Sequence, residues 1–274
     1  MSHATSSDRD RAYRHDLFLA PEWTARFDAI ISEHVEIPTK GSILEINCGT
    51  GARVIEMSEA MQEGEVVGVD PSSEQITIAR AKAQALDAER CTFAQGDPAR
   101  LDLGDETFDL VIADATLEPP ARLAPIVAEA ARVSRGGSLV LAKLTLRGSF
   151  DELSSVYWEA LFELGLVDRV WPSLEALILA RPTLEQALGT LEAAGLADVT
   201  PHQTKEEFRF DTGPELMTSP LVADLFLDEW LSIVPEDRVG DVRLGMARII
   251  DRERGGYYFD FSVKALLAEG RKPE

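Results

Sequence analysis

The most informative segment of this sequence is Ile43-Leu44-Glu45-Ile46-Asn47-Cys48-Gly49-Thr50-Gly51. It reads as a short apolar strand that runs into a turn of small residues. A second apolar strand, Val66-Val67-Gly68-Val69-Asp70, ends in an aspartate about 20 residues further on, the layout of a nucleotide-binding strand–helix–strand unit. The two strands therefore predict a parallel α/β sheet and a ligand that contains a ribose.

The residue types after each strand fit that ligand. Gly49 and Gly51 carry no Cβ, so the backbone can turn tightly and approach a ligand closely. Asp70 can accept hydrogen bonds from both hydroxyl groups of a ribose, a role that a carboxylate fills. Ligands of open α/β sheets bind at the carboxyl ends of the strands, which is where these residues lie.

The glycine spacing bears on which nucleotide is bound. A dinucleotide-binding fingerprint has a third small residue that allows close contact between helix and strand. Counted from Gly49, that position is occupied by Val54. We therefore expect that NAD is not the cofactor.

The glycine segment resembles motif I of the class I S-adenosylmethionine-dependent methyltransferases, an acidic residue followed by x-G-x-G-x-G. In this chain the motif stands as Glu45-x-Asn47-x-Gly49-x-Gly51, with Asn47 in place of the first glycine. Asparagine reaches unusual backbone angles better than most residues, which suits it to this place. The chain is most similar in pattern to small-molecule enzymes of methyltransferase types 11 and 25.

Further segments between residues 40 and 145 resemble the same family in the right order. They are residues 68–75, 93–98 and 108–114, with 132–139 after them. The resemblance implies S-adenosyl-L-methionine as the cofactor. It implies that Asp70 holds the ribose, that Pro71 packs on adenine, and that Asp97, next to Pro98, accepts from the adenine amino group. It also places Glu45, Asn47 and Asp114 beside the cofactor.

The rest of the chain alternates strand and helix patterns. This predicts the α/β class, with a doubly wound, seven-stranded, mostly parallel sheet of Rossmann-like type and helical insertions after strands 5 and 6. A helix over residues 21–36 is expected to begin at Pro21, because proline is favourable in a first helical turn. The expected parts are an N-terminal helical cap (1–40), the S-adenosylmethionine-binding core (41–148), a helical insertion or lid (149–181), the remainder of the core sheet (182–211 and 256–270) and a second helical insertion or lid (212–255).

Composition narrows the partners. The chain has 27 Lys and Arg against 48 Asp and Glu, which gives a net charge of −21. A surface this negative repels the phosphate backbone of nucleic acids. Nucleic acid is therefore not expected as a partner. The polar N-terminus reads as neither a signal peptide nor a membrane anchor, which predicts a cytoplasmic protein without a membrane partner. Cys48 and Cys91 do not suggest a disulfide framework, and the four scattered histidines predict no metal site.

The resemblance also defines the expected reaction. The methyl group of S-adenosylmethionine is electrophilic, so the protein has chiefly to align a nucleophile with it and to exclude water. A base helps where the acceptor is a hydroxyl or a protonated amine, and the candidates are His15 and Asp114. We expect Trp158, Trp171 and Trp230, all in the insertions, to line a pocket for a small apolar or aromatic acceptor. The insertions could also form a homodimer.

Two other functions fit parts of the sequence. A non-catalytic protein could keep the fold and the cofactor as an interaction module. Asn47, the acidic surface and the presence of Leu117 where similar enzymes often have a histidine motivate this alternative. An NAD-dependent enzyme is the third reading. Retention of Asp70 and Asp97 favours bound S-adenosylmethionine in either of the first two cases.

Overall fold

The computed structural model describes residues 7–253 and 255–274, apart from the side chain of Leu225. The first six residues of the predicted cap, and residue 254 of the second predicted insertion, lie outside this part. The chain divides into two compact units. Unit 1 comprises residues 1–144, 184–203 and 266–274, and unit 2 comprises residues 145–183 and 204–265.

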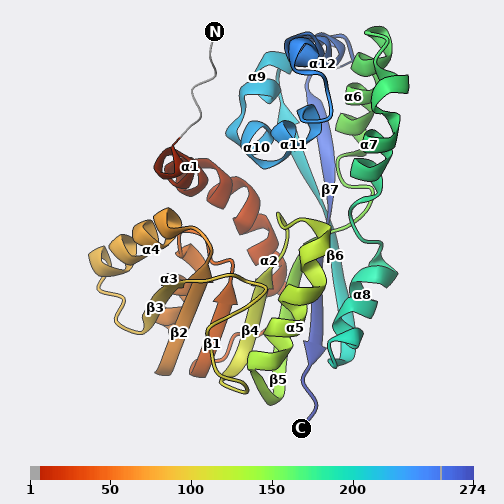
Figure 1. Ribbon diagram of the computed structural model, residues 1–274. Coiled ribbons are helices and arrows are strands. Elements are labelled where there is room, and N and C mark those ends of the chain that lie inside the picture. The colour runs from red at the N-terminus through yellow and green to blue at the C-terminus, as the bar shows by residue number, and fades with distance from the viewer. Residues whose placement is uncertain (1–6, 254) are drawn as a thin grey trace. The chain divides into compact units, whose positions relative to one another are not determined.

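A single seven-stranded sheet carries the fold. Its strands are β1 (Lys40–Ile46), β2 (Glu63–Asp70), β3 (Cys91–Gln95), β4 (Phe108–Asp114), β5 (Ser134–Thr145), β6 (Ala197–Phe210) and β7 (Phe259–Arg271). The order is β3-β2-β1-β4-β5-β7-β6. The five strands from β3 to β5 in this order are parallel to one another. Figure 1 shows β3, β2, β1 and β4 side by side in unit 1.

The strand β7 runs against its neighbours. Lys272 N–H donates to the carbonyl of Ser138, whereas Leu146 N–H donates to the carbonyl of Lys264, so β5 and β7 are antiparallel. The predicted doubly wound, mostly parallel sheet of seven strands is therefore confirmed.

Helices of unit 1 connect these strands. They are α3 (Ala52–Ala60), α4 (Ser73–Ala85), the short 3-10 helix η2 (Pro120–Arg122), α5 (Leu123–Val133) and α8 (Leu184–Ala193). Each long helix buries an apolar stripe, with Val54, Ile76 and Ile126 almost fully inaccessible. The start of α4 is fixed by Ser72, whose side chain accepts from the N–H of Gln75, a common N-cap contact.

The N-terminal helical region starts earlier than the sequence predicted. It consists of α1 (Asp8–Arg14), the π-helix η1 (His15–Thr24) and α2 (Ala25–His34). The expected start at Pro21 was wrong, because Pro21 lies inside η1. A capping box between Ser7 and Asp10 starts α1 instead, and the wider π-helical turn passes through the proline.

The turn after β1 adopts left-handed backbone angles. Asn47, Gly49 and Gly51 have φ values of 60°, 56° and 76°, as the expected tight turn requires. A Cβ on Gly51 would lie 2.5 Å from the ring of Phe93, and one on Gly49 would lie 2.8 Å from His15 Cε1. Gly51 is thus needed for packing within the protein as well as for the tight turn.

Unit 2 holds the predicted insertions. Its helices are α6 (Asp151–Glu163), α7 (Val167–Leu179), α9 (Gly213–Thr218), α10 (Pro220–Val222), the π-helix η3 (Ala223–Leu227), α11 (Asp228–Leu231), the 3-10 helix η4 (Glu236–Arg238) and α12 (Val239–Glu253). Phe261 of β7 packs on Phe150 and Phe208 at ring centroid distances of 5.6 and 5.1 Å. Through such contacts residues 204–211 and 256–265, which we expected in the core, group with unit 2.

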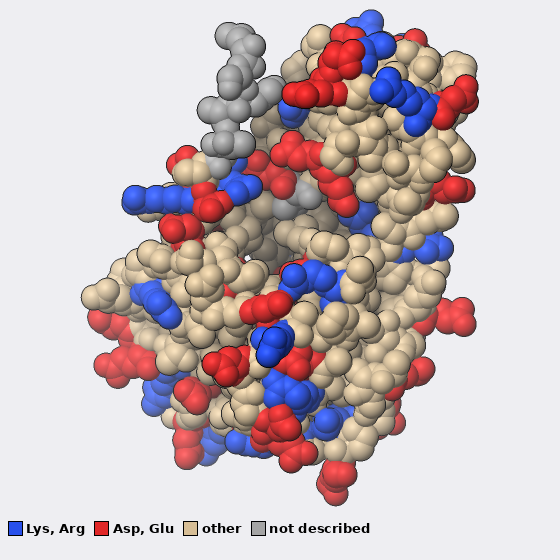
Figure 2. All heavy atoms as spheres, viewed as in Figure 1, with Lys and Arg blue, Asp and Glu red and all other residues tan. Residues whose placement is uncertain are grey.

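The described surface is strongly mixed in charge. Figure 2 shows acidic and basic side chains interspersed on the visible face of each unit. Among the described residues, no helix combines the length and the apolar character needed to cross a membrane. Cytoplasmic location and the lack of a membrane partner stay predictions.

Candidate functional site

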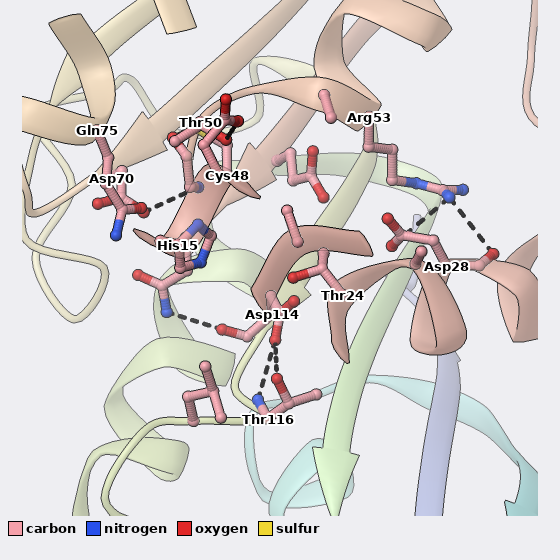
Figure 3. A pocket seen from close by; sticks show the side chains of 18 of the residues that line it. His15, Thr24, Asp28, Cys48, Thr50, Arg53, Asp70, Gln75, Asp114 and Thr116 are labelled. Carbon is pink, nitrogen blue, oxygen red and sulfur yellow. Dashed lines mark hydrogen bonds and ion pairs between the residues drawn. The ribbon is translucent and has the colours of Figure 1, made fainter. Parts of the chain in front are cut away.

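A pocket of about 700 Å³ opens in unit 1 at the carboxyl ends of β1, β2 and β4. It brings together most of the residues that the sequence singled out. They are His15, Glu45, Asn47, Gly49, Asp70, Pro71 and Asp114. Figure 3 shows the side chains of His15, Asp70 and Asp114 around this pocket, with those of Asp28 and Arg53.

Asp70 closes the turn after β1. Its Oδ2 accepts from the N–H of Gly49 at 2.9 Å, and its Oδ1 accepts from the N–H of Ser72 at 2.9 Å. Removal from water raises the pKa of Asp70 although both N–H groups oppose this. Each carboxylate oxygen can accept more than one hydrogen bond, so acceptor capacity remains for a ligand.

Two acceptors in the pocket have no partner among the described residues. Asn47 donates from Nδ2 to the carbonyl of Asp114 at 2.7 Å and to Glu118 Oε1 at 3.0 Å, which leaves its Oδ1 without a donor. Glu45 Oε2 is also buried and finds no donor among the described residues. Burial raises the pKa of Glu45 to about 7, although Lys143 pulls it down. Unsatisfied buried acceptors are costly, so both call for a donor from a ligand.

A buried lysine organises the carboxylates beneath the pocket. Lys143 of β5 is fully buried, and its Nζ lies 2.7 Å from Asp28 Oδ1, 2.9 Å from Asp114 Oδ2 and 3.6 Å from Glu45 Oε1. Burial alone would lower the pKa of Lys143, but the three carboxylates raise it well above its usual value. Arg53 adds a second cation, 3.6 Å from Asp28.

Neither Lys143 nor Asp28 was among the predicted site residues. The available signal was the charged Lys143 inside the otherwise apolar run Ser138-Leu139-Val140-Leu141-Ala142-Lys143-Leu144. A charge in such a strand indicates a buried ion pair, because an unpaired one would be very unfavourable.

Asp114 is committed to this network. Besides Lys143 it accepts from the N–H and the hydroxyl of Thr116, at 3.0 and 2.6 Å. Burial would raise the pKa of Asp114, but Lys143 and Thr116 outweigh it and lower the pKa. Trp23 Nε1 donates to Thr116 Oγ1 at 3.0 Å, so the N-terminal helices also contact this loop. A carboxylate held this way is a weak proton acceptor.

His15 has the opposite character. Its Nδ1 is buried without a partner among the described residues, and burial lowers the pKa of His15 despite the attraction of Asp114 and Asp16. The imidazole is therefore neutral at pH 7 and able to accept a proton. Its neighbour Asp16 is held by Lys82 at 2.7 Å and by Thr50 at 2.5 Å.

Asp97 and Pro98 lie outside the residues that line the pocket. The Asp97 side chain is 56% exposed, pairs with Arg122, and accepts from the N–H of Ala99 at 3.1 Å. Arg122 also reaches Glu118 at 3.0 Å, and Glu118 lines the pocket. The adenine contact of Asp97 stays a prediction.

The three tryptophans of the predicted acceptor pocket differ in their surroundings. Trp158 and Trp171 are 40% and 45% exposed, whereas Trp230 is 6% exposed and lines a small cavity of unit 2. Trp158 stacks on Phe162 with ring centroids 5.3 Å apart. The role of these residues in acceptor binding stays a prediction.

The cysteines and possible metal ligands offer no other chemistry in the described chain. Cys48 and Cys91 are both free, and burial raises the pKa of the Cys48 thiol well above its usual value. The described residues contain no group of three His, Cys, Asp or Glu side chains placed to hold a metal ion.

Known proteins with similar sequences include methyltransferases. Residues 43–137 match the family model described as "Methyltransferase domain". A demethylmenaquinone methyltransferase of Roseiflexus sp. (strain RS-1) is 28% identical over 192 residues, which cover 67% of this chain and 78% of that protein.

Solved structures share the fold. The YcgJ protein of Bacillus subtilis aligns with a TM-score of 0.60 at 19% identity, covering 92% of this chain and 99% of its own. Phosphoethanolamine N-methyltransferase 2 of Haemonchus contortus, in complex with phosphomonomethylethanolamine and S-adenosylhomocysteine, aligns with a TM-score of 0.59 at 16% identity, covering 99% of this chain and 59% of its own.

The sheet, the glycine turn and these matches support a class I S-adenosylmethionine-dependent methyltransferase, with S-adenosylmethionine as its cofactor. The matches do not favour the alternative of a non-catalytic interaction module.

Proposed function

We propose that the pocket of unit 1 binds S-adenosylmethionine and that the enzyme transfers its methyl group to a small apolar or aromatic acceptor. The observation that carries the site assignment is the pair of unpartnered acceptors, Glu45 Oε2 and Asn47 Oδ1, which both belong to residues lining the pocket. The ammonium group of the cofactor's methionine part supplies the hydrogen-bond donors that they lack. Asp70, at the end of the neighbouring strand, takes the ribose hydroxyls.

The charge of the pocket supports this ligand. Seven carboxylate residues line it, Asp16, Asp28, Glu45, Glu56, Asp70, Asp114 and Glu118, against the cations Arg53 and Lys82. S-adenosylmethionine carries a sulfonium and an ammonium group, so an excess of carboxylates favours it. The two phosphates of NAD would instead be repelled.

The cofactor supplies an electrophilic methyl group, and the protein supplies position and a proton acceptor. His15 is the better general base, because its imidazole is neutral and its Nδ1 is free of protein partners among the described residues. Asp114 serves instead as the partner of Lys143.

The proposed acceptor class follows from the aromatic residues of unit 2. Phe150, Phe226 and Trp230 lie within 6.4 Å of one another by ring centroids and give that unit an apolar interior. Binding sites for small acceptors are mostly apolar with few polar groups. A homodimer through the insertions and the absence of nucleic-acid binding remain part of the proposal.

Titration calorimetry with S-adenosylhomocysteine and NAD tests the site. Asp70→Asn keeps the shape of the side chain but removes its charge. Loss of a charge-assisted hydrogen bond to a ribose hydroxyl costs about 1.5–3 kcal/mol, which lowers the affinity for S-adenosylhomocysteine by about 10- to 100-fold. Asp237→Asn, on an exposed turn of η4, is the matched control and should bind like the wild type. Unchanged affinity in Asp70→Asn, or binding of NAD as tight as that of S-adenosylhomocysteine, would contradict the assignment.

A further inference from the structure

Unit 2 contains three cations near the end of β5 that have no carboxylate partner. Within the described residues, no carboxylate oxygen lies within 4.0 Å of the side-chain nitrogens of Arg147, Arg181 or Lys264. Among the other described basic residues of the same unit, Arg169, Arg243 and Arg248 also have no such partner, whereas Lys205, Arg209, Arg238 and Arg252 do. In a chain with 48 acidic residues and a net charge of −21, a cluster of unpaired cations needs an explanation.

Arg181 is the most confined of the three. Its Nε donates to Thr145 Oγ1 at 3.2 Å, and its guanidinium carbon lies 4.6 Å from the centroid of the Phe150 ring. The two terminal nitrogens donate to no described residue. Burial lowers the pKa of Arg181, and the attraction of Glu229 does not make up for it. The two terminal nitrogens are not among the buried side-chain atoms that lack a partner, so solvent reaches them and an anion from outside can do so as well.

The other two cations surround the same segment. Arg147 donates from Nε to the carbonyl of Arg181 at 3.2 Å and from a terminal nitrogen to the carbonyl of Leu179 at 2.9 Å. These two hydrogen bonds hold the backbone of residues 179–181. The ammonium of Lys264 lies directly over Gly148, which has a φ of 85°. Both side chains therefore lie beside residues 148 and 179–181.

A small cavity opens beside Arg181. Its volume is about 10 Å³, and Gly148, Ser149 and Ser154 line it on the polar side. This is space for about one water molecule, so it can take one polar group and not a whole ligand. Asp151 also lines the cavity but pairs with none of the three cations.

The opposite wall of the cavity is apolar. Leu174, Leu177 and Ile178 of α7 contribute to it, together with Trp230. Ile178 is 40% exposed, so apolar surface continues outward from the cavity. A ligand that fits this wall and Arg181 has one charged end and an apolar body.

We propose that Arg181 binds the oxyanion group, a carboxylate or a phosphate monoester, of a small molecule that places one oxygen in the adjoining cavity and whose apolar body lies on Leu177 and Ile178. The guanidinium offers its two free terminal nitrogens in the fork geometry that carboxylate and phosphate oxygens match. This site lies wholly within unit 2 and is proposed as a further binding site, independent of the proposed cofactor pocket of unit 1.

Benzoate and phenyl phosphate are suitable probes, with benzyl alcohol as the uncharged control. Titration calorimetry on the full chain is expected to show binding of at least one of the two anions and none of benzyl alcohol. The anion that binds identifies the oxyanion as carboxylate or phosphate. Arg181→Gln should weaken this binding at least about tenfold, as loss of a charge-assisted bond implies. Arg181→Lys keeps the charge but not the fork, and should fall between.

Two controls separate binding from structure. Arg209→Gln removes an exposed arginine of the same unit that pairs with Asp260, and should leave anion binding unchanged. Because an unpaired guanidinium is unfavourable, Arg181→Gln should not lower the thermal unfolding midpoint in the absence of anion. If neither anion binds the wild type, if Arg181→Gln binds the anion as tightly, or if benzyl alcohol binds equally well, the site does not exist.

Titration of S-adenosylhomocysteine into the same proteins distinguishes this site from the proposed cofactor pocket. Arg181→Gln is expected to bind S-adenosylhomocysteine like the wild type. If the wild type binds S-adenosylhomocysteine but neither anion, the Arg181 site alone is overturned. Absence of S-adenosylhomocysteine binding in the wild type would overturn the proposed pocket and leave the anion result to stand by itself.

Discussion

Replacing Lys143 by methionine is the most severe test of the network beneath the pocket. Methionine is unbranched and of similar length, so the substitution removes the charge with little change in volume. In the native protein Lys143 Nζ contacts Asp28, Asp114 and Glu45 at 2.7, 2.9 and 3.6 Å, and its side chain is almost completely buried. The variant leaves these carboxylates facing one another.

Removal of one partner from a buried ion pair costs about 3–5 kcal/mol. In the variant Asp28 keeps its ion pair with Arg53 at 3.6 Å, and Asp114 keeps its two hydrogen bonds from Thr116. These two carboxylates therefore still have partners. We therefore expect a loss of about 3 kcal/mol in the free energy of unfolding at pH 8. In a chain of this size that lowers the unfolding midpoint by about 6–12 °C.

The loss should depend on pH with a definite sign. Asp114 has a lowered pKa in the folded protein, so it contributes stability above its unfolded pKa, near 3.8, and that contribution disappears as the pH falls through the folded value. Without Lys143 the pKa of the buried carboxyls rises, and protonation near pH 5 removes their repulsion. The difference between variant and wild type should thus shrink from pH 8 to pH 5.

Urea and thermal unfolding followed by circular dichroism at pH 8 and pH 5 measure both effects. Lys205→Met, which removes an exposed lysine paired with Glu207, is the control and should unfold like the wild type. The reasoning is refuted if Lys143→Met is as stable as the wild type at pH 8, or if its loss of stability is the same at both pH values.

Three further outcomes are expected. Glu45→Gln should stabilise the protein by up to about 3 kcal/mol above pH 7, because the pKa of Glu45 is about 7 in the folded protein against 4.5 in the unfolded one. The ionised carboxylate is therefore unfavourable above pH 7 and has no effect on stability below pH 4.5. Calorimetry should show that the same variant binds S-adenosylmethionine more weakly. His15→Ala should reduce turnover at pH 8 about 10²-fold or more while S-adenosylhomocysteine affinity stays within a few-fold, and an unchanged rate would remove His15 as the base. Trp158→Ala should raise KM for the acceptor without changing cofactor affinity, and equal effects on both would place Trp158 outside the acceptor pocket.

The local parts of the fold and site were predictable from the sequence. The glycine turn and Asp70 are encoded by a strand, small residues and an acid at short spacing, so a single segment reveals them. In the structure Gly49 and Gly51 have left-handed backbone angles, and Asp70 lines the pocket. The reason for Gly51 was not readable, since its neighbour Phe93 is distant in the sequence.

Long-range pairs were not predictable in this way. Lys143 and Asp28 are separated by 115 residues, and no spacing rule connects a strand lysine with an N-terminal helix. The start of the helical region was missed for a different reason. Pro21 carries a local preference for a first turn, but it lies inside the π-helix η1, which has already begun at His15. Arg181 likewise gains its character only from the burial that tertiary structure imposes.

The position of β7 between β5 and β6 has a consequence for biosynthesis. β6 ends at Phe210 and β7 begins at Phe259. Both strands that flank β7 in the sheet, β5 and β6, are therefore synthesised before β7 itself. At about 5–20 residues per second, translation of the intervening segment takes about 2–10 s. During this interval β5 and β6 expose unpaired backbone groups, the template on which strands of neighbouring chains aggregate. The speed of translation between these two phenylalanines, and the chaperones present meanwhile, therefore govern how much of the newly made enzyme reaches its native state.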